Sequence, residues 1–382
     1  MSTRRKNILI TGGNFTNQGA YLMLCAAAEQ IRSRWNAQPV IAMQTGSERA
    51  KRWVGLDSLL EFPKLRISVW GGNPDRLRGL RHRMPFVVGA EIDAVFDVSG
   101  FVFSDEWAHL DLRRRADDLI RWSGRGVPVV LLPQAFGPFQ HVTEPVSDLL
   151  DACELVYARD PDSANFLKGI ARSATAFEKI AVATDFTTVL RSEEPRGSAH
   201  LRGMVPIVAN WNIAKRAAGH GGSEDAYVRN LEEVVRVVRS HGHEVYGLCH
   251  EGGGDAELLR ALAGRCGGLQ VVEGLDGRQS KWLLGQAPFV VSGRFHALVS
   301  ALSQGVPGLV HGWSHKYRWL SEEYGVSNLV LDPYEDPGTV EATVGARLRE
   351  IEAVRKSVIE LATVKKAETE QMWSDIEKRI EL

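Results

Sequence analysis

The feature that constrains this chain most is the alternation of short apolar, β-branched runs with longer segments of helical character. The runs are short and have no polar face, which is typical of strands buried on both sides of a parallel sheet. Parallel strands need crossover connections, so the pattern predicts an α/β fold with doubly wound sheets. The predicted strands lie at 8–10, 39–42, 94–98, 127–132, 154–157, 205–209, 244–248 and 288–291.

The length of the chain indicates more than one domain. It has 382 residues, and domains average roughly 150 residues. A polar stretch at 191–198 contains Pro195 and Gly197, and the strand pattern begins again after it. We therefore expect an N-terminal Rossmann-like domain over 1–195, a C-terminal one over 196–340, and a cleft between them. A helical tail over 341–382 is expected to pack back on the first domain.

Composition excludes several classes of protein. The chain has 46 Lys and Arg against 47 Asp and Glu, whereas proteins that bind duplex nucleic acid usually carry a basic excess. Its four cysteines form no CxxC pair, which argues against a zinc ribbon or redox motif and is typical of a reducing compartment. No apolar run approaches the roughly 18 residues of a membrane span. Because the start also lacks the apolar core of a signal peptide, we expect a cytoplasmic protein.

Two candidate segments follow predicted strands in the first half. The turn at 12–19 is rich in glycine, which lets a backbone approach a ligand at a helix N-terminus, but it matches neither GxGxxG nor the P-loop. Asn14 and Asn17 favour a polar ligand there over a plain tight turn. The second segment, 97–107, ends with Asp105 and Trp107. A carboxylate beside an aromatic ring is typical of a sugar platform, and a solvated acidic loop is the equally weighted alternative.

Arg159 is the third candidate of this half, because it follows the strand at 154–157. An Arg at the carboxyl end of a strand can hold an anion, since ligands bind at that edge of open α/β sheets. An ion pair with Asp160 or Asp162 is the alternative. The neighbouring loop at 132–139 carries two prolines and a glycine, which either shape a pocket wall or only turn the chain.

The richest segment is Ser-Gly-Arg-Phe-His at 292–296, where a buried strand meets a helix. A helix N-terminus favours anions, Arg294 adds bidentate recognition of carboxylate or phosphate, and His296 can transfer a proton near neutral pH. The following loop carries His311, His315 and Lys316. It contains no carboxylate or Cys, and Lys316 would repel a cation, so we expect an anion pocket and no metal.

Two basic runs remain. One holds Arg76, Arg78, Arg81, His82 and Arg83, and the other is Arg113–Arg115. Such runs are most often solvated faces. Contact with anionic lipid head groups or a lipid-linked acceptor at the inner face of the membrane is the alternative.

Taken together, these segments resemble the polysaccharide pyruvyl transferase family. Six motifs follow one another in the family's order from residue 7 to about 325, and the one around Arg294 and His296 is the most specific. They are the Gly-Asn-x-x-Asn-x-Gly turn at 13–19, the Ser-Gly-Phe loop ending at Asp105, 132–134 with 137–138, 157–160 with Ser163, 292–297, and 305–307 with Lys316.

The resemblance implies a fold similar to glycosyltransferases of the B type, and transfer of a pyruvyl group from phosphoenolpyruvate to two hydroxyls of a sugar in a polysaccharide or glycolipid precursor. Phosphoenolpyruvate is then a substrate, and no separate cofactor is expected. Carried over by position, Arg159, Arg294 and His296 would bind phosphoenolpyruvate, to which the anion pocket adds Lys316. Asp105 would activate the acceptor hydroxyl. The acceptor would also meet Asn14, Asn17 and Trp107.

Two other functions fit the same pattern. A nucleotide-sugar-dependent glycosyltransferase would recruit a carboxylate for the ribose, and Glu251 and Asp255, beside Gly252–Gly254, are available in sequence. A non-catalytic relative would bind a carbohydrate or an anion without turning it over. Phosphoenolpyruvate binding and phosphate release distinguish these alternatives.

Overall fold

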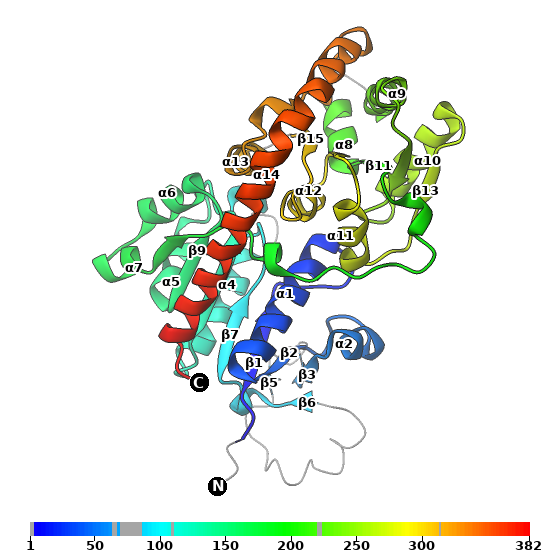
Figure 1. Ribbon diagram of the computed structural model, residues 1–382. Coiled ribbons are helices and arrows are strands. Elements are labelled where there is room, and N and C mark those ends of the chain that lie inside the picture. The colour runs from blue at the N-terminus through cyan, green and yellow to red at the C-terminus, as the bar shows by residue number, and fades with distance from the viewer. Residues whose placement is uncertain (1–3, 63–66, 69–85, 108–110, 220–223, 313–314) are drawn as a thin grey trace. The chain divides into compact units, whose positions relative to one another are not determined.

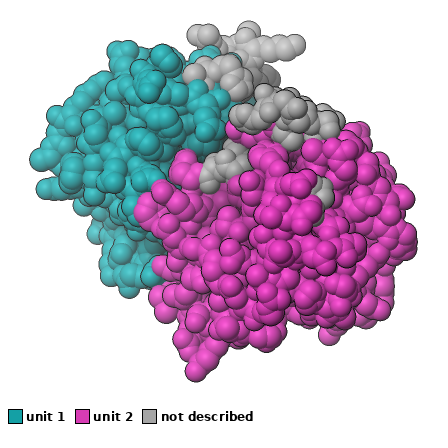
Figure 2. Space-filling model, turned by 90° about the horizontal axis from the view of Figure 1, so that it is seen from above, with its two compact units in different colours: residues 1–186, 368–382 teal, residues 187–367 magenta. Residues whose placement is uncertain are grey.

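The computed structural model describes residues 4–62, 67–68, 86–107, 111–219, 224–312 and 315–382 (Figure 1). The chain divides into two compact units, which Figure 2 colours separately. Unit 1 comprises Met1–Phe186 and Glu368–Leu382, and unit 2 comprises Thr187–Ala367. The first unit thus ends at Phe186, earlier in the chain than the expected boundary after residue 195.

Unit 1 is built on a parallel sheet with the order β10-β9-β8-β7-β1-β2-β3-β6 among the described residues. The order reverses between β1 and β7, because successive strands leave β1 first on one side and then on the other. The strands are β1 (Asn7–Thr11), β2 (Gln38–Ala42), β3 (Asp57–Leu59), β6 (Phe86–Val87), β7 (Ala94–Asp97), β8 (Val129–Gln134), β9 (Leu155–Ala158) and β10 (Ile180–Val182). A separate antiparallel pair joins β4 (Glu61–Phe62) to β5 (Ile67–Ser68).

Helices cover both faces of this sheet. Leu9, Val95 and Leu131 share one core cluster with buried residues of α4 (Leu112–Ser123) and α5 (Thr143–Ala152). Phe96 points to the opposite face, as period-2 alternation requires, and its ring packs against Trp35 and Trp373. The other helices of the unit are α1 (Gln18–Trp35), α2 (Glu48–Val54), α6 (Pro161–Ile170) and α7 (Ala174–Glu178).

Unit 2 repeats the same design with the parallel order β13-β12-β11-β14-β15-β16. Its order reverses between β11 and β14. The strands are β11 (Val205–Val208), β12 (Val245–Leu248), β13 (Gln270–Val272), β14 (Val290–Ser292), β15 (Gly308–His311) and β16 (Val330–Leu331). The helices are α8 (Trp211–Gly219), α9 (Glu224–Ser240), α10 (Gly254–Cys266), α11 (Gly277–Gly285), α12 (Phe295–Leu302) and α13 (His315–Glu323).

The tail is one helix, α14 (Pro337–Arg379), drawn from orange to red in Figure 1. Its residues from Glu368 onward belong to unit 1. There, the fully buried Trp373 contacts Trp35, Phe96 and Phe186, and Arg379 pairs with Glu154 at 2.5 Å. The aromatic contacts hold the end of the tail on the first unit.

Two parallel-sheet α/β units confirm the fold class predicted from the sequence, and each predicted strand overlaps an observed one. The prediction missed several strands of two to four residues each: β3, β6, β10, β13, β15 and β16 in the two large sheets, and the β4–β5 pair. Within the described ranges, no helix combines the length and the apolarity needed to cross a membrane.

Candidate functional site

The strongest candidate site lies in unit 2, where the strand order reverses. β14 ends at Ser292, and α12 begins at Phe295 with Arg294 as its N-cap residue. The neighbouring β11 ends at Val208, and Asn210 lies just beyond it. In open α/β sheets, ligands bind outside the carboxyl ends of the strands at such a reversal point. The position of the start of α12 in the fold therefore makes it a candidate ligand-binding site.

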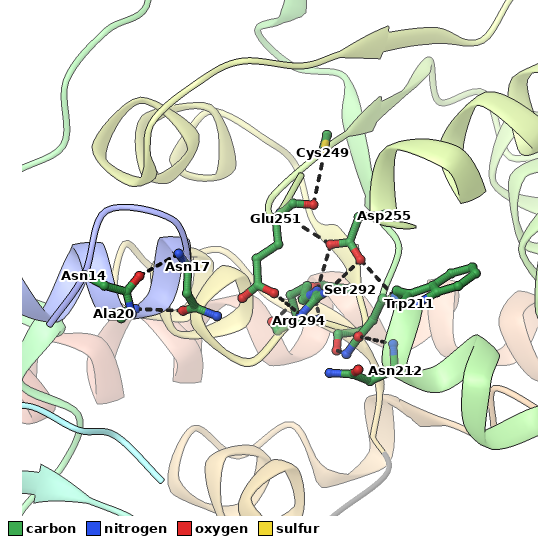
Figure 3. A network of polar contacts seen from close by, with 12 residues as sticks. Asn14, Asn17, Ala20, Trp211, Asn212, Cys249, Glu251, Asp255, Ser292 and Arg294 are labelled. Atoms are coloured by element: carbon green, nitrogen blue, oxygen red, sulfur yellow. Dashed lines mark hydrogen bonds and ion pairs between the residues drawn. The ribbon is translucent and has the colours of Figure 1, made fainter. Parts of the chain in front are cut away.

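The guanidinium of Arg294 is held by two carboxylates (Figure 3). Its Nε donates to Asp255 Oδ2 at 2.8 Å, its Nη2 to Asp255 Oδ1 at 2.5 Å, and its Nη1 to Glu251 Oε2. The Arg294 side chain is 11% exposed, that of Glu251 23%, and that of Asp255 not at all. The sequence predicted that Arg294 binds the anionic groups of a ligand. In the structure, its guanidinium binds two carboxylates of the protein itself.

Asp255 is fixed by its own backbone environment. It lies in the first turn of α10, where a carboxylate is stabilised by the helix dipole. The backbone N–H groups of Trp211 and Glu251 donate to its two oxygens at 2.9 and 3.3 Å. Burial alone would lower the pKa of Arg294, but the hydrogen bonds and charge of Asp255, with the charge of Glu251, raise it above its ordinary value. Arg294 is therefore permanently cationic.

The backbone of Gly293 is bound by two side chains at the point where the strand order reverses. Its carbonyl oxygen accepts hydrogen bonds from Asn210 Nδ2 at 2.6 Å and from Tyr317 Oη at 2.7 Å. A Cβ at this position would lie 2.7 Å from Ile213 Cδ1, so only glycine fits without movement. Sequence reasoning missed Asn210 and Tyr317. The only available signal for Asn210 was its place directly after a predicted strand.

Lys316 and His296 lie around the same helix start. The Lys316 Nζ is 5.6 Å from the ring centroids of both Phe295 and Tyr317, which is cation–π range. The rings of Phe295 and His296 have centroids 5.4 Å apart. The structure thus brings together three of the residues predicted for the site, Arg294, His296 and Lys316, while their chemical roles stay predictions.

Two buried histidines flank this cluster. His250, just beyond β12, and His311, at the end of β15, are 2% and 1% exposed. Neither has a hydrogen-bond partner for its ring nitrogens within the described part of the chain. Burial, with the positive charges of Arg294 and His296, lowers the pKa of His250 to about 3, and burial lowers that of His311 to about 4. Both imidazoles are neutral at physiological pH.

Unit 1 has its own polar network at its reversal point. Asp97, at the end of β7, is 3% exposed. It accepts hydrogen bonds from Thr11 Oγ1 at 2.8 Å, Ser99 Oγ at 2.9 Å and Gln134 Nε2 at 3.1 Å. Gly12 has φ +81° and lies so close to this network that a Cβ would come within 2.4 Å of Ser99 Oγ. Asp97 was not singled out from the sequence as a site residue.

Asn14 and Asn17 shape the turn before α1. The Asn14 Oδ1 accepts from the backbone N–H groups of Thr16 at 3.0 Å and Asn17 at 2.8 Å. Asn17 is the N-cap of α1, and its Oδ1 accepts from the N–H of Ala20 at 2.9 Å (Figure 3). The side-chain oxygens therefore have a structural role, and contact with an acceptor is a further, separate prediction.

The carboxylate of Asp105 also has a structural role. It lies in a short 3₁₀ helix with Trp107, which is 37% exposed. Its Oδ2 accepts from the N–H of Gln140 at 2.5 Å and its Oδ1 from the N–H of His141 at 2.9 Å. Burial opposes the charged form, but these hydrogen bonds outweigh it and hold the pKa of Asp105 below its ordinary value. It is ionised at neutral pH and is a weaker base than an unperturbed carboxylate.

Arg159 forms a buried ion pair with a partner that the sequence did not indicate. Its Nη1 donates to Asp185 Oδ2 at 3.1 Å, and the two side chains are 6% and 2% exposed. Asp160, proposed as its partner, instead caps α6 by accepting from the N–H of Ser163 at 2.7 Å. Arg159 is thus in an ion pair, but with Asp185, which the sequence alternative did not name.

The basic runs are only partly described. Residues 76–83 lie outside the described part of the chain. Arg113 pairs with Glu144 at 2.7 Å and with Asp148 at 3.0 Å on the surface of unit 1. These contacts fit an ordinary solvated face, and membrane contact stays a prediction.

Comparison of the complete chain with solved structures agrees with the fold. UDP-GlcNAc 2-epimerase from Neisseria meningitidis, bound to UDP-GlcNAc, aligns with a TM-score of 0.62 over 98% of this chain and 100% of that one, at 9% identity. MnaA from S. aureus, solved with UDP, aligns with a TM-score of 0.54 over 94% and 91%, at 12% identity. At this identity the likeness shows the fold alone, which is of the glycosyltransferase B type.

Sequence comparison identifies the family. No curated protein sequence matches the chain significantly. The family model described as polysaccharide pyruvyl transferase, however, matches residues 17–315. This match includes the reversal point of unit 2 and most of both units. The chain therefore belongs to the polysaccharide pyruvyl transferase family and is a transferase.

Proposed function

We propose that the protein transfers the pyruvyl group of phosphoenolpyruvate to two hydroxyls of one sugar in a polysaccharide or glycolipid precursor. The products are a cyclic pyruvate ketal and phosphate. The observation that carries the proposal is the grouping of Arg294, His296 and Lys316 around the start of α12 in a member of this family. Phosphoenolpyruvate is a substrate in this scheme, and no separate cofactor is required.

The donor fits the chemistry of the site in unit 2. Phosphoenolpyruvate carries a carboxylate and a phosphate with a charge of roughly −1.5 to −2. The start of α12 offers backbone N–H groups and a helix dipole, and Arg294 and Lys316 add two cations. Arg159 is also a predicted donor ligand. Its guanidinium is 6% exposed and bound to Asp185, so this role requires that the ion pair rearrange.

The proposed reaction has three steps. His296 gives a proton to the methylene carbon of phosphoenolpyruvate, which becomes a methyl group. A first acceptor hydroxyl forms a C–O bond to the adjacent carbon, and Asp105 takes the proton of that hydroxyl. A second hydroxyl then bonds to the same carbon as the bond between that carbon and the phosphate oxygen breaks, and the proton of this hydroxyl leaves with the phosphate. The acceptor is proposed to bind unit 1 near Asn14, Asn17 and Trp107.

A nucleotide-sugar-dependent glycosyltransferase is the second candidate, because two of the similar structures contain UDP or UDP-GlcNAc. That function would need a carboxylate of unit 2 for the ribose hydroxyls. Asp255, however, is fully buried and accepts two hydrogen bonds from Arg294. Asp255 is therefore not available to a ribose, and Glu251, the other carboxylate named for this role, is paired with Nη1 of Arg294.

Thermal unfolding with phosphoenolpyruvate and, separately, with UDP-sugars tests the proposal without knowledge of the acceptor. A ligand at 100 times its dissociation constant stabilises by about 2.7 kcal/mol. We expect a rise of Tm with phosphoenolpyruvate that Lys316→Ala reduces, and no rise with UDP-sugars. The reverse pattern would contradict pyruvyl transfer and support the glycosyltransferase.

Turnover then distinguishes an enzyme from a binding protein. With a saccharide acceptor, phosphate release should fall by about 10²–10⁴ in His296→Asn, the usual contribution of a proton-transfer group. His200→Gln, at an exposed site of the same unit, is the control. Phosphoenolpyruvate binding without phosphate release across a broad acceptor screen would instead indicate a non-catalytic relative.

A further inference from the structure

We propose that Glu251 is an internal competitor of the anionic donor, which lowers the affinity of the site and lowers it most for highly charged ligands. The proposal rests on the proposed function, because the ligand tested is phosphoenolpyruvate. Its basis is the contact between the Glu251 carboxylate and Nη1 of Arg294, the cation predicted to hold the donor.

The two carboxylates on Arg294 differ in how firmly they are held. Asp255 is completely buried, binds Nε and Nη2 together, and accepts two backbone N–H groups. The Glu251 side chain is 23% exposed and contacts the guanidinium through one nitrogen. Asp255 is therefore the permanent partner of Arg294, and Glu251 is the one that an incoming anion can replace.

The backbone around Glu251 permits this exchange. Glu251 precedes three consecutive glycines, Gly252–Gly254, and Gly253 has φ +62°. A Cβ on Gly252 or Gly253 would meet no atom within 4 Å. At these two positions, therefore, there is open space beside the loop. The carboxylate can therefore swing away while Asp255 keeps the guanidinium in place.

The charges of the cluster show why exchange matters. Arg294 carries one positive charge, and Asp255 and Glu251 each carry one negative charge, so the three side chains together are anionic. A phosphate that approached this cluster would be repelled. When Glu251 withdraws, the remaining pair is neutral, and Lys316 and the N-terminus of α12 attract the ligand. Glu251 keeps its charge after it withdraws, so the cost that it adds to binding grows with the charge of the ligand.

Isothermal titration of the full-length protein with phosphoenolpyruvate tests the proposal. Glu251→Gln removes the competing charge, and we expect its dissociation constant to be about tenfold lower than that of the wild type, a factor that corresponds to about 1.4 kcal/mol. Glu257→Gln is the matched control. It removes the same charge from an exposed position in the first turn of α10, the helix that follows the loop of Glu251, and we expect no such gain.

A second ligand separates electrostatic competition from a loosened loop. The repulsion that Glu251 exerts grows with the charge of the ligand. Glu251→Gln should therefore improve binding of phosphoenolpyruvate by a larger factor than binding of pyruvate, a monoanion. Glu251→Asp keeps the charge with a shorter reach, and its affinities should fall between those of the wild type and Glu251→Gln.

Each outcome is decisive. If the wild type binds phosphoenolpyruvate and Lys316→Ala weakens it, but Glu251→Gln binds no more tightly, the competitor role is wrong and the proposed donor stands. An equal gain for pyruvate and phosphoenolpyruvate would also overturn the competitor role. If neither the wild type nor Glu251→Gln binds phosphoenolpyruvate, the proposed function and the competitor both fail.

Discussion

The guanidinium of Arg294 and the carboxylate of Asp255 form a bidentate ion pair at the point where the strand order of unit 2 reverses, with nitrogen–oxygen distances of 2.8 and 2.5 Å. Asp255 has no exposed surface in this pair. A buried charge is tolerated when its partner is present and is costly when it is not. This pair therefore links the stability of unit 2 to the residue predicted to bind the donor.

The first prediction follows from that link. Arg294→Ala leaves the Asp255 carboxylate buried without its cation and should destabilise unit 2 by about 3–5 kcal/mol. Arg294→Ala/Asp255→Asn removes the stranded charge and should recover part of the loss. Urea unfolding of both variants measures the difference. Equal loss in the single and double variants would show that the stranded charge is not the cause.

The second prediction concerns Gly293. A methyl group there would lie 2.7 Å from Ile213 Cδ1 and 3.1 Å from Tyr227 Oη. Gly293→Ala should therefore cost about 1–3 kcal/mol by overpacking, and it should weaken phosphoenolpyruvate binding because the peptide before Arg294 shifts. Gly264→Ala, in α10 with nothing within 4 Å of the added Cβ, should be neutral or stabilising, since alanine favours helices. A Tm for Gly293→Ala as high as that of Gly264→Ala would contradict the overpacking argument.

The third prediction is a pH dependence at Asp105. Its pKa is lowered on folding, so its charged form contributes stability above the ordinary value of 3.8, and this contribution is lost as pH falls through the lower folded value. Asp105→Asn should lower Tm at pH 7, because an amide has only one oxygen for the two N–H donors of Gln140 and His141. Below about pH 3.8 the difference should shrink.

Glu106→Gln is the control for Asp105→Asn, because Glu106 is the exposed neighbour in the same 3₁₀ helix. It should leave Tm unchanged at both pH values. A constant Tm difference between the wild type and Asp105→Asn from pH 7 to pH 3 would show that the charge of Asp105 has no part in holding the loop.

The fourth prediction concerns the acid sensitivity caused by His250. Its pKa is lowered to about 3 on folding, whereas in the unfolded chain it lies near 6.5. Between these values the unfolded state binds the extra proton, so stability falls as pH falls, by up to about 1.4 kcal/mol per pH unit. His250→Gln cannot take up this proton and should lose less Tm than the wild type between pH 7 and pH 5.

His311→Gln should behave similarly, because the pKa of His311 is lowered to about 4. His200→Gln, at an exposed position, should keep the wild-type acid sensitivity. If all three variants lose as much Tm as the wild type, protonation of buried imidazoles does not limit stability in acid.

Much of the fold was predictable from the sequence, because local patterns encode it. The run at 94–98 is apolar except for Asp97, and its first four residues form β7 near the centre of a parallel sheet. The motif around Arg294 was predicted to join a strand to a helix, and in the structure it joins β14 to α12. The edge strand β16 was missed because its two residues carry no periodic signal.

The partners of the charged residues were not predictable in the same way. Arg159 is bound to Asp185, 26 positions away, a partner that the neighbouring sequence does not indicate. The Asp105 carboxylate is occupied by backbone groups 35 and 36 positions away. Such contacts depend on which loops meet at the edge of a sheet, and no spacing in the chain records that.

Burial periodicity and glycine-rich turns act over a few residues, so the two-sheet α/β architecture, the family and the segments near the ligand-binding edge are encoded locally in the chain. The electrostatic state of that edge depends on residues that are distant in sequence. Asp255 and Glu251 lie 39 and 43 positions from Arg294, and folding brings both onto its guanidinium. A charge in a protein interior is defined by its neighbours in space, so the chain order alone identified the cation but not the anions that hold it.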